Sequence, residues 1–400
     1  MPTESELVQS GQMYLYPNYR QPPFVFVRGQ GSELFDASGK RYLDLYAGIA
    51  VSTLGHAHPK LTAAIAEQAG KLLHVSNYFY NEPNVRLAAQ LCRLSGMDRA
   101  FFCNSGTEAI EATLKLARRH FYAKGQTERQ RVIAFRNSFH GRTLGALAAT
   151  GQDKYKDGFG PLPGVTHVTY GDTEAVRRAM GPDVAGILVE PVQGEGGVLP
   201  APPGFLRELR ALADSHGALL LADEVQTGIG RTGSFLAMQQ EGVQADAVAL
   251  AKALGGGVPI GAMVCKKFLE EALPPGSHGS TFGGNPLASA AALTVLDVLE
   301  NDGLLAHVKQ RGEELSALLA KTVAKFPKLV ECARGRGLLQ ALVLREGVDA
   351  RKVMSTLQES GVLLTIAGGQ ALRFSPPLVV TKAELEEGVT VLERALTSYA

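Results

Sequence analysis

The chain is poor in the features that mark secreted, metal-binding or membrane proteins. It has no tryptophan and only four cysteines in 400 residues. These cysteines, Cys92, Cys103, Cys265 and Cys332, follow no metal-ligand spacing, so we expect buried free thiols in a reducing cytoplasm. Long apolar runs are also missing: none reaches about 18 residues without a glycine or a charge, which argues against a membrane-spanning helix.

An excess of charge of either sign is missing as well. The sequence has 40 Lys and Arg against 39 Asp and Glu, and a formal net charge of +1. This balance argues against binding to nucleic acid or a membrane surface. The polar, acidic start of the chain resembles neither a secretory signal nor an arginine-rich transit peptide, which again predicts a cytoplasmic protein. With 45% hydrophobic residues, the chain is typical of a globular enzyme of about two domains.

Short apolar runs alternate with helical patterns through the middle of the chain. Such alternation predicts right-handed crossovers and therefore an α/β fold, with a mostly parallel central sheet covered by helices on both faces. The predicted strands are residues 100–103, 132–135, 185–189, 218–222 and 247–251.

Smaller units are expected on both sides of this region. Residues 25–36 predict a hairpin-like segment with residues 36–39 as its turn, and residues 285–300 predict a long helix. The C-terminal part predicts helices over residues 303–326, 349–360 and 381–398 and strands over 337–344 and 371–374. The expected domains are residues 1–50, associated with the small domain, residues 51–294 as the large domain, and residues 295–400 as a smaller α+β domain.

Two strand endings place reactive side chains at one edge of the predicted sheet. One apolar run ends at Lys252 and a glycine turn, and the preceding one ends at Asp223. Ligands of open α/β sheets bind outside the carboxyl ends of the strands, so both side chains are expected in one site. Burial disfavours a charged lysine and can make its amine a nucleophile. The alternative is a strand-end lysine whose amine reaches water.

A third segment is expected to open a helix at the same edge. Ser105-Gly106-Thr107-Glu108 precedes a helical pattern that runs to about Lys124. Ser105 and Glu108 have capping-box spacing, and Gly106 leaves backbone amides accessible to a ligand. The segment therefore predicts a phosphate-binding helix start, although a capped helix by itself is common in proteins without a ligand there.

A lysine for a Schiff base, a carboxylate for a pyridine nitrogen and a helix start for a phosphate are what pyridoxal phosphate needs from a protein. In these residues, and in one collinear order from about Tyr19 to the end, the chain resembles the class III, fold type I aminotransferases, most closely the acetylornithine aminotransferases. The motifs are Asn137-Ser-Phe139-His140-Gly-Arg142-Thr, Glu190-Pro-Val-Gln-Gly-Glu195-Gly-Gly, Asp223-Glu-Val-Gln-Thr-Gly-Ile-Gly-Arg231-Thr-Gly, Leu250-Ala-Lys252-Ala-Leu-Gly-Gly-Gly and His278-Gly-Ser280-Thr281-Phe-Gly-Gly-Asn285-Pro.

The resemblance implies pyridoxal 5'-phosphate as cofactor and a role for each matched residue. Lys252 is expected to bind the cofactor and then act as general base and acid, while Asp223 pairs with the pyridinium nitrogen. Phe139 is expected to stack on the ring and Gln226 to bond its hydroxyl. Thr281 is expected to reach the phosphate of the partner subunit, which implies a homodimer with shared sites. The implied cofactor-binding set is Ser105, Gly106, Thr107, Phe139, Asp223, Glu224, Val225, Gln226, Lys252 and Thr281.

Two arginines remain for substrate carboxylates. Guanidinium groups bind carboxylates in a bidentate way, so Arg142 and Arg373 suit 2-oxoglutarate, although each could be a surface or ion-paired arginine. By resemblance to the ω-aminotransferases, Glu195 pairs with Arg373 while the amino donor is bound and swings away for 2-oxoglutarate. The implied substrate-binding set is Arg142, Glu195, Ser280, Arg373 and Tyr19.

The resemblance implies transfer of the terminal amino group of N-acetylornithine to 2-oxoglutarate in arginine biosynthesis. Succinylornithine, N-succinyl-diaminopimelate, ornithine and 4-aminobutyrate remain open as donors, because acyl selectivity needs only about 1–3 kcal/mol. Ile49 and Gly196 differ from the tyrosine and alanine usual in ornithine enzymes. Tyr19, in contrast, matches a tyrosine that those enzymes use for the donor's carboxylate.

Two functions of other classes are weaker alternatives. A glutamate-semialdehyde aminomutase shares the fold and the Lys/Asp pair, but it has no use for 2-oxoglutarate, and the arginine pair with Glu195 argues against it. A non-catalytic binding protein is disfavoured by the intact Lys252 and Asp223.

Nearby histidines and aromatic residues receive no catalytic role. His140 is not needed as a second base beside Lys252, and His56 and His58 are too closely spaced for a helical metal pair, so no metal is predicted. The cluster Tyr78-Phe-Tyr80 is expected to pack in the core rather than line the substrate site at a dimer interface.

Overall fold

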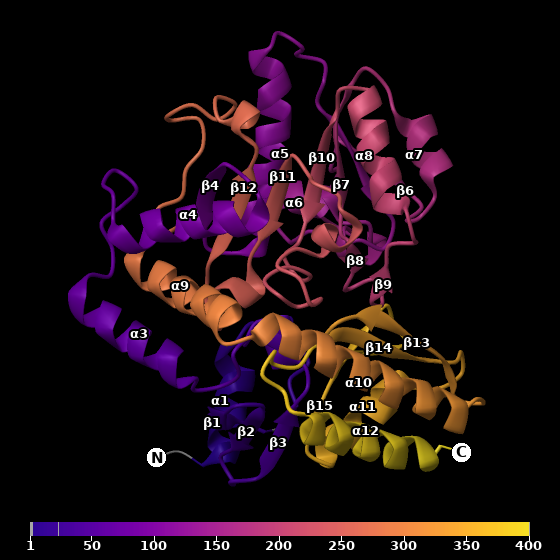
Figure 1. Cartoon of the computed structure of the whole chain (residues 1–400). Coiled ribbons are helices and arrows are strands. Elements are labelled where there is room, and N and C mark those ends of the chain that lie inside the picture. Colours follow the sequence, from indigo (N-terminus) through magenta and orange to yellow (C-terminus); the bar gives the residue numbers. More distant parts are fainter. Residues whose placement is uncertain (1–2, 23, 400) are drawn as a thin grey trace.

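The computed structural model describes residues 3–22 and 24–399. Its largest sheet has the strand order β4-β12-β11-β10-β7-β5-β6 and occupies the upper half of Figure 1. These strands are β4 (Arg99–Cys103), β5 (Arg131–Phe135), β6 (Val165–Val168), β7 (Val184–Val189), β10 (Leu219–Asp223), β11 (Ala247–Leu250) and β12 (Gly261–Cys265). The five predicted strands are thereby confirmed, and β6 and β12 are additional.

Four of the six strand pairs in this sheet are parallel, and only β12 runs antiparallel to both of its neighbours, β4 and β11. Strand β12 has this direction because of the connection that joins it to β11. No crossover helix separates β11 from β12; only a glycine-rich turn that begins with η3 (Lys252–Gly255) lies between them. The chain therefore returns beside the strand it has just left.

Helices cover both faces of this sheet, as the sequence predicts. In β10, Leu219 and Leu221 belong to the same apolar cluster as Ile110 of α5 (Gly106–Ala123). Leu220 and Ala222, which point to the opposite face, belong to the cluster that contains Leu206 and Leu209 of α8 (Phe205–Ser215). The other helices of this region are α3 (Pro59–Lys71), α4 (Glu82–Ser95), α6 (Leu144–Ala149), α7 (Thr173–Ala179) and α9 (Pro286–Asn301).

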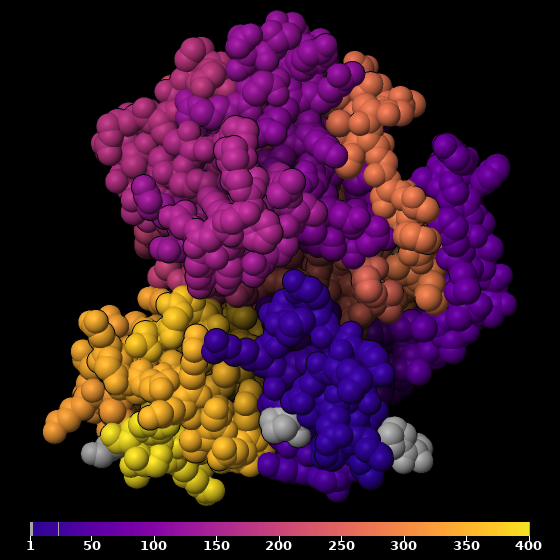
Figure 2. Space-filling view, turned by 180° about the vertical axis from the view of Figure 1, so that it is seen from behind, coloured from indigo at the N-terminus to yellow at the C-terminus, as the bar shows by residue number. Residues whose placement is uncertain are grey.

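The N-terminal and C-terminal segments together form a second part of the molecule, in the lower half of Figure 1. Strands β1 (Phe26–Gln30), β2 (Glu33–Asp36) and β3 (Arg41–Asp44) form an antiparallel meander, and β15 (Val362–Leu363) pairs in parallel with β3. Figure 2 shows the indigo N-terminal segment directly beside the yellow C-terminal one. The predicted hairpin was therefore incomplete: residues 25–36 already form two strands, and the turn at residues 36–39 leads into a third.

A separate four-stranded sheet lies in the C-terminal part. Its order is β13-β14-β17-β16, with β13 (Val330–Arg336), β14 (Leu339–Leu344), β16 (Thr365–Ala367) and β17 (Ala371–Phe374). The helices of this part are α10 (Leu304–Lys325), α11 (Ala350–Glu359) and α12 (Lys382–Thr397). Strands β13, β15 and β16 were not predicted. In β13 the sequence Val-Glu-Cys-Ala-Arg-Gly-Arg carries too few apolar residues to indicate a strand, and only its first residue is buried.

Smaller elements complete the described fold. They are α1 (Glu4–Tyr14), α2 (Ala47–Ala50), the paired strands β8 (Val192–Gln193) and β9 (Leu199–Pro200), and the short 3-10 turns η1 (Asp153–Tyr155), η2 (Ala237–Glu241) and η4 (Lys267–Leu269). Among the described residues, no helix is both long and apolar enough to cross a membrane. The four cysteines are free thiols, of which Cys103 and Cys265 are buried whereas Cys92 and Cys332 are partly exposed.

Candidate active site

A cavity of about 370 Å³ lies at the carboxyl ends of strands β4, β10 and β11. This is the edge at which the sequence predicts the site, and the three predicted segments converge there. The predicted site residues that line the cavity are Ser105, Gly106, Thr107, Phe139, Arg142, Glu195, Asp223, Val225, Gln226 and Lys252.

Lys252 enters the cavity directly after strand β11, as the first residue of η3. Its backbone has a φ of 40°, an uncommon left-handed conformation for a lysine. Burial lowers the pKa of its amine, and the neighbouring carboxylates of Glu195 and Asp223 only partly counteract this. The geometry therefore favours a lysine that can release its proton more easily than a surface lysine.

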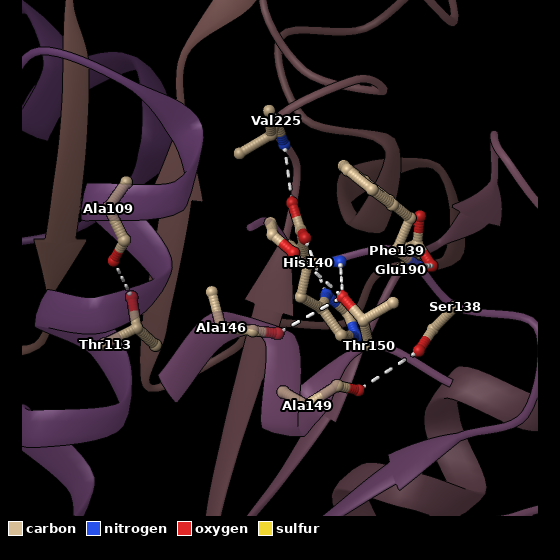
Figure 3. Close-up of polar contacts among 12 residues, drawn as sticks. Ala109, Thr113, Ser138, Phe139, His140, Ala146, Ala149, Thr150, Glu190 and Val225 are labelled. Carbon is tan, nitrogen blue, oxygen red and sulfur yellow. Dashed lines mark hydrogen bonds and ion pairs between the residues drawn. The ribbon is translucent and has the colours of Figure 1, made fainter. Parts of the chain in front are cut away.

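Asp223 is fixed by neighbours on both carboxylate oxygens. Its Oδ2 lies 2.7 Å from His140 Nδ1, and its Oδ1 accepts a 3.0 Å hydrogen bond from the backbone amide of Val225. His140 is held in turn by its own amide, which donates to Thr150 Oγ1 at 3.0 Å (Figure 3). The sequence placed His140 in a site motif but did not predict this contact, which fixes the position of the Asp223 carboxylate.

The start of helix α5 forms the opposite part of the site. Ser105 is the N-cap and accepts a hydrogen bond from the amide of Glu108 at 3.3 Å. The reciprocal bond of the predicted capping box is shifted by one residue, because Glu108 accepts from the amide of Asn104 at 2.6 Å. A Cβ on Gly106 would lie 2.7 Å from Val225 Cγ1, so only glycine fits here. Amides at such a helix start suit an anionic group.

Glu195, Gln226 and Arg373 form one connected polar cluster. Arg373 is 2% exposed and its Nη1 donates to Glu195 Oε1 at 2.5 Å and to Gln226 Oε1 at 3.3 Å. Gln226 Nε2 donates to the same Glu195 oxygen at 3.4 Å. Burial by itself raises the pKa of Glu195, but the charges of Arg373 and Lys252 outweigh it, so this pKa lies below its usual value. The carboxylate is therefore ionised and paired.

Glu190 is a buried carboxyl group that the sequence placed in a motif without a role. Its Oε2 accepts a 3.2 Å hydrogen bond from the amide of Phe139, and Figure 3 labels the two residues next to each other. Burial and the nearby charge of Asp223 hold the pKa of Glu190 well above its usual value. A protonated Glu190 can lie close to Asp223 without like-charge repulsion.

Comparison with known proteins decides the family. The model of the class-III aminotransferase family matches residues 14–396. The chain belongs to the class III aminotransferases. It is 52% identical over 382 residues to the acetylornithine aminotransferase of Myxococcus xanthus, with 95% of each chain covered.

Two solved structures are similar over nearly the whole chain. Acetylornithine aminotransferase from Elizabethkingia anophelis has a TM-score of 0.89 at 33% identity and covers all of both chains. Ornithine aminotransferase from Toxoplasma gondii has a TM-score of 0.95 at 34% identity, over 99% of this chain and 94% of that one, and was solved with partial occupancy of pyridoxal phosphate at its active site. The predicted fold type I architecture and the transaminase class are thereby confirmed.

Pyridoxal phosphate is the cofactor of this family, and the residues around the cavity fit it. Among the residues that the sequence assigns to it and that line the cavity, Lys252 would supply the amine, Asp223 a carboxylate for the ring nitrogen, and Gly106 and Thr107 the helix start for the phosphate. The buried carboxylate of Asp223, held by His140 and the Val225 amide, would face the protonated ring nitrogen and so compensate its charge.

Glu224 belongs to the predicted cofactor-binding set, but its side chain points away from the cavity. It accepts hydrogen bonds from the amides of Ala237 and Met238 at 3.0 and 2.9 Å, and a third from Thr227. Burial raises its pKa to about 7 despite these bonds. The Glu224 carboxylate thus supports η2, and the predicted contact of this residue with the cofactor stays a prediction.

Tyr19, Ser280 and Thr281 do not line this cavity within the single chain. Tyr19 is 77% exposed. Ser280 Oγ accepts from Asn104 Nδ2 at 3.2 Å, beside the start of helix α5, whereas Thr281 lines a separate small recess near Asn77. Their predicted roles stay predictions.

The aromatic cluster of Tyr78, Phe79 and Tyr80 corrects one expectation. These residues were expected in the core, but they are 93%, 72% and 96% exposed. The three aromatic residues follow one another with no polar residue to indicate a face, so their sequence could not distinguish a core position from a surface that awaits a partner. His56, to which the sequence gives no metal-binding role, lies with its Nε2 2.7 Å from Asp44 Oδ2.

Proposed function

We propose that the chain transfers the terminal amino group of N-acetylornithine to 2-oxoglutarate, giving N-acetylglutamate 5-semialdehyde and glutamate in arginine biosynthesis. The observation that carries the proposal is the buried Arg373 guanidinium, which is paired with Glu195 in the same cavity as Lys252. An arginine that is masked by a carboxylate can disfavour an α-carboxylate in one half-reaction and bind it in the other.

The bound cofactor supplies the electron sink that lets the substrate carbon next to nitrogen lose a proton. Asp223, oriented by His140, keeps a proton on the ring nitrogen because opposite charges at contact favour the protonated ring. Lys252, with its lowered pKa, moves the proton at the substrate carbon as general base and then as general acid.

Arg142 and Arg373 divide the carboxylates of the substrates between them. Arg142 is exposed at the cavity, and its guanidinium stacks 4.0 Å from the ring centre of Tyr155, which holds it at the entrance. In our proposal Arg142 binds the donor's carboxylate in one half-reaction and the γ-carboxylate of 2-oxoglutarate in the other. Glu195 leaves Arg373 only for the α-carboxylate of 2-oxoglutarate.

Single-turnover half-reactions with a panel of amino donors test this proposal through the absorbance of the cofactor. The panel is N-acetylornithine, succinylornithine, N-succinyl-diaminopimelate, ornithine, 4-aminobutyrate and glutamate 1-semialdehyde. We expect N-acetylornithine to react fastest and 2-oxoglutarate to restore the starting spectrum. A faster reaction with ornithine or 4-aminobutyrate would reject the proposed donor, and turnover of glutamate 1-semialdehyde without 2-oxoglutarate would indicate the isomerase.

We further propose a homodimer whose sites are shared between subunits. The exposed Tyr78 and Tyr80 lie next to the segment that carries Thr281, because Asn77 Nδ2 donates to the carbonyls of Ser280 at 2.8 Å and Gly283 at 3.1 Å. Phe282, in the same segment, is also 61% exposed. Exposed aromatic residues around a predicted site residue support an interface that brings Thr281 to the partner's cofactor.

We also propose two units within each subunit, a large one over residues 51–294 and a small one over residues 295–400 with residues 1–50 attached to it. The parallel pairing of β15 with β3 supports this attachment. The free thiols support a reducing compartment, and we propose the cytoplasm.

A further inference from the structure

The segment that carries Glu195 is packed without spare space. We use the name Glu195 loop for residues 194–197. A Cβ on Gly194 would lie 1.7 Å from Gln226 Oε1, and one on Gly196 would lie 2.8 Å from the carbonyl oxygen of Asn137. The Glu195 loop can therefore shift only if the groups that enclose it shift as well.

On its other side, the Glu195 loop is bound by the four-stranded C-terminal sheet. Arg334 of β13 donates two hydrogen bonds to the carbonyl oxygen of Gly197, from Nε at 3.0 Å and from Nη2 at 2.8 Å. Gly368, in the turn between β16 and β17, donates its amide to the carbonyl of Glu195 at 3.0 Å. The carbonyl of Glu195 itself and the carbonyl two residues later are thus fixed by residues more than a hundred positions away along the chain.

The register of the sheet relates Arg334 to Arg373. Arg334 lies opposite Ala341 of β14, and Ala341 lies opposite Arg373 of β17. Directly opposite residues in antiparallel strands lie on the same face, so both arginines project toward the same side, about 10 Å apart across two strand spacings. The residue between them, Ala341, is small and fully buried. One arginine holds the Glu195 carboxylate and the other holds the backbone two residues later.

We propose that Arg334 is a positioning residue that holds the Glu195 loop in the place where Glu195 masks Arg373. This inference rests on the proposed function, in which that mask selects the donor's terminal amine. Arg334 does not line the cavity that contains Lys252. It keeps a fixed distance between the backbone of the Glu195 loop and the strand that carries Arg373. Without Arg334, the carboxylate is presented less often to Arg373, and an α-carboxylate reaches that guanidinium more easily.

The test compares Arg334→Met with Arg336→Met. Arg336 is the matched control because it lies two residues along the same strand and also contacts the large part of the chain, donating to Glu241 Oε1 at 2.8 Å and to Ala201 O at 3.3 Å. The measured quantity is the ratio of the single-turnover rate with N-acetylornithine to that with L-glutamate. We expect Arg334→Met to lower the ratio about tenfold, Arg334→Lys to restore part of it, and Arg336→Met to leave it within about twofold of the wild type.

A double-mutant cycle with Glu195→Gln distinguishes a lost positioning of Glu195 from a general loss of activity in Arg334→Met. If Arg334 acts by holding Glu195 against Arg373, Arg334→Met causes no further change in the ratio of rates when Glu195 is already replaced by glutamine. A further tenfold loss in that background, or an equal loss in Arg336→Met, overturns the proposal.

Hydrogen–deuterium exchange gives a measurement that needs no turnover. In cofactor-free protein we expect the amides of Val198 and Gly368 to exchange at least about tenfold faster in Arg334→Met than in Arg336→Met. Equal protection in the two variants overturns the inference. If the wild type reacts with no donor of the panel, the proposed function fails, and the exchange comparison still decides whether Arg334 holds the Glu195 loop.

Discussion

At the scale of a single residue, burial and neighbouring charges have opposing effects on the pKa of Lys252. Burial lowers its pKa, and the carboxylates of Glu195 and Asp223 raise it. We expect Lys252→Ala to lower turnover by about 10³-fold or more, since it removes both the amine that holds the cofactor and the proton carrier. Borohydride reduction followed by peptide mapping should fix the cofactor on Lys252 in the wild type and leave no adduct in the variant. The exposed Lys267 is the control, and Lys267→Ala should keep both activity and labelling.

Glu224 predicts a dependence of stability on pH. Its pKa is about 7 in the folded protein, above its usual 4.5, because it is buried. Between these two values the folded state binds the proton and the unfolded state has lost it, so stability falls as the pH rises through this window. The loss is on the order of 3 kcal/mol.

Glu224→Gln should remove this pH dependence in the cofactor-free protein. Urea unfolding at pH 5 and pH 8 measures it: the wild type should lose stability relative to the variant at the higher pH. A constant difference between the two proteins at both pH values would show that Glu224 keeps its usual pKa.

At the scale of elements, the site depends on helix α5 beginning at Gly106, against Val225. A Cβ at Gly106 would lie only 2.7 Å from Val225 Cγ1. Gly106→Ala must therefore displace either the start of helix α5 or Val225, which lies in the same segment as Asp223. We expect cofactor affinity to fall by about tenfold to a hundredfold. Titration of the cofactor-free protein with pyridoxal phosphate measures this.

Gly70→Ala is the control, because it makes the same substitution in a helix away from the cavity. Gly70 lies inside helix α3, and a Cβ there meets no atom within 4 Å. It should leave cofactor affinity unchanged and stabilise the helix by about 0.5–1 kcal/mol. If the two alanine variants bind the cofactor equally well, the close approach of α5 to Val225 has no part in the site.

At the scale of the whole molecule, the proposed dimer makes each site from two chains. A mixture of Lys252→Ala subunits with Thr281→Ala subunits should regain activity, because one site of each mixed dimer then contains an unmutated Lys252 and an unmutated Thr281. Activity of the mixture after refolding together, compared with each variant alone, measures the effect. Full activity of the wild type as a monomer in analytical ultracentrifugation would contradict the shared site.

The sequence alone determined five of the seven strands of the central sheet and the three segments that converge on the cavity, because these depend on local signals. Apolar runs that end at Asp223 and Lys252 define two strands and their carboxyl ends, and a capped helix start at Ser105 defines the third segment. The five predicted strands therefore appear in the structure, and the residues that these patterns singled out, Ser105, Gly106, Asp223 and Lys252, line one cavity. The other predicted residues that line it came from the resemblance to the family and not from local patterns.

Only the tertiary structure decided the contacts between distant segments. The bond of His140 to Asp223 and the register that aligns Arg334 with Arg373 join residues that are far apart along the chain. The direction of the Glu224 side chain, away from the cavity, depends on how a buried side chain packs. The strand that carries Arg334 is half-exposed and charged, so its own pattern does not mark it as a strand, and its place is fixed by pairing with β14. Local periodicity encodes an element and its exposed end, whereas partners across a sheet or a cavity are selected by packing and charge once the whole chain has folded.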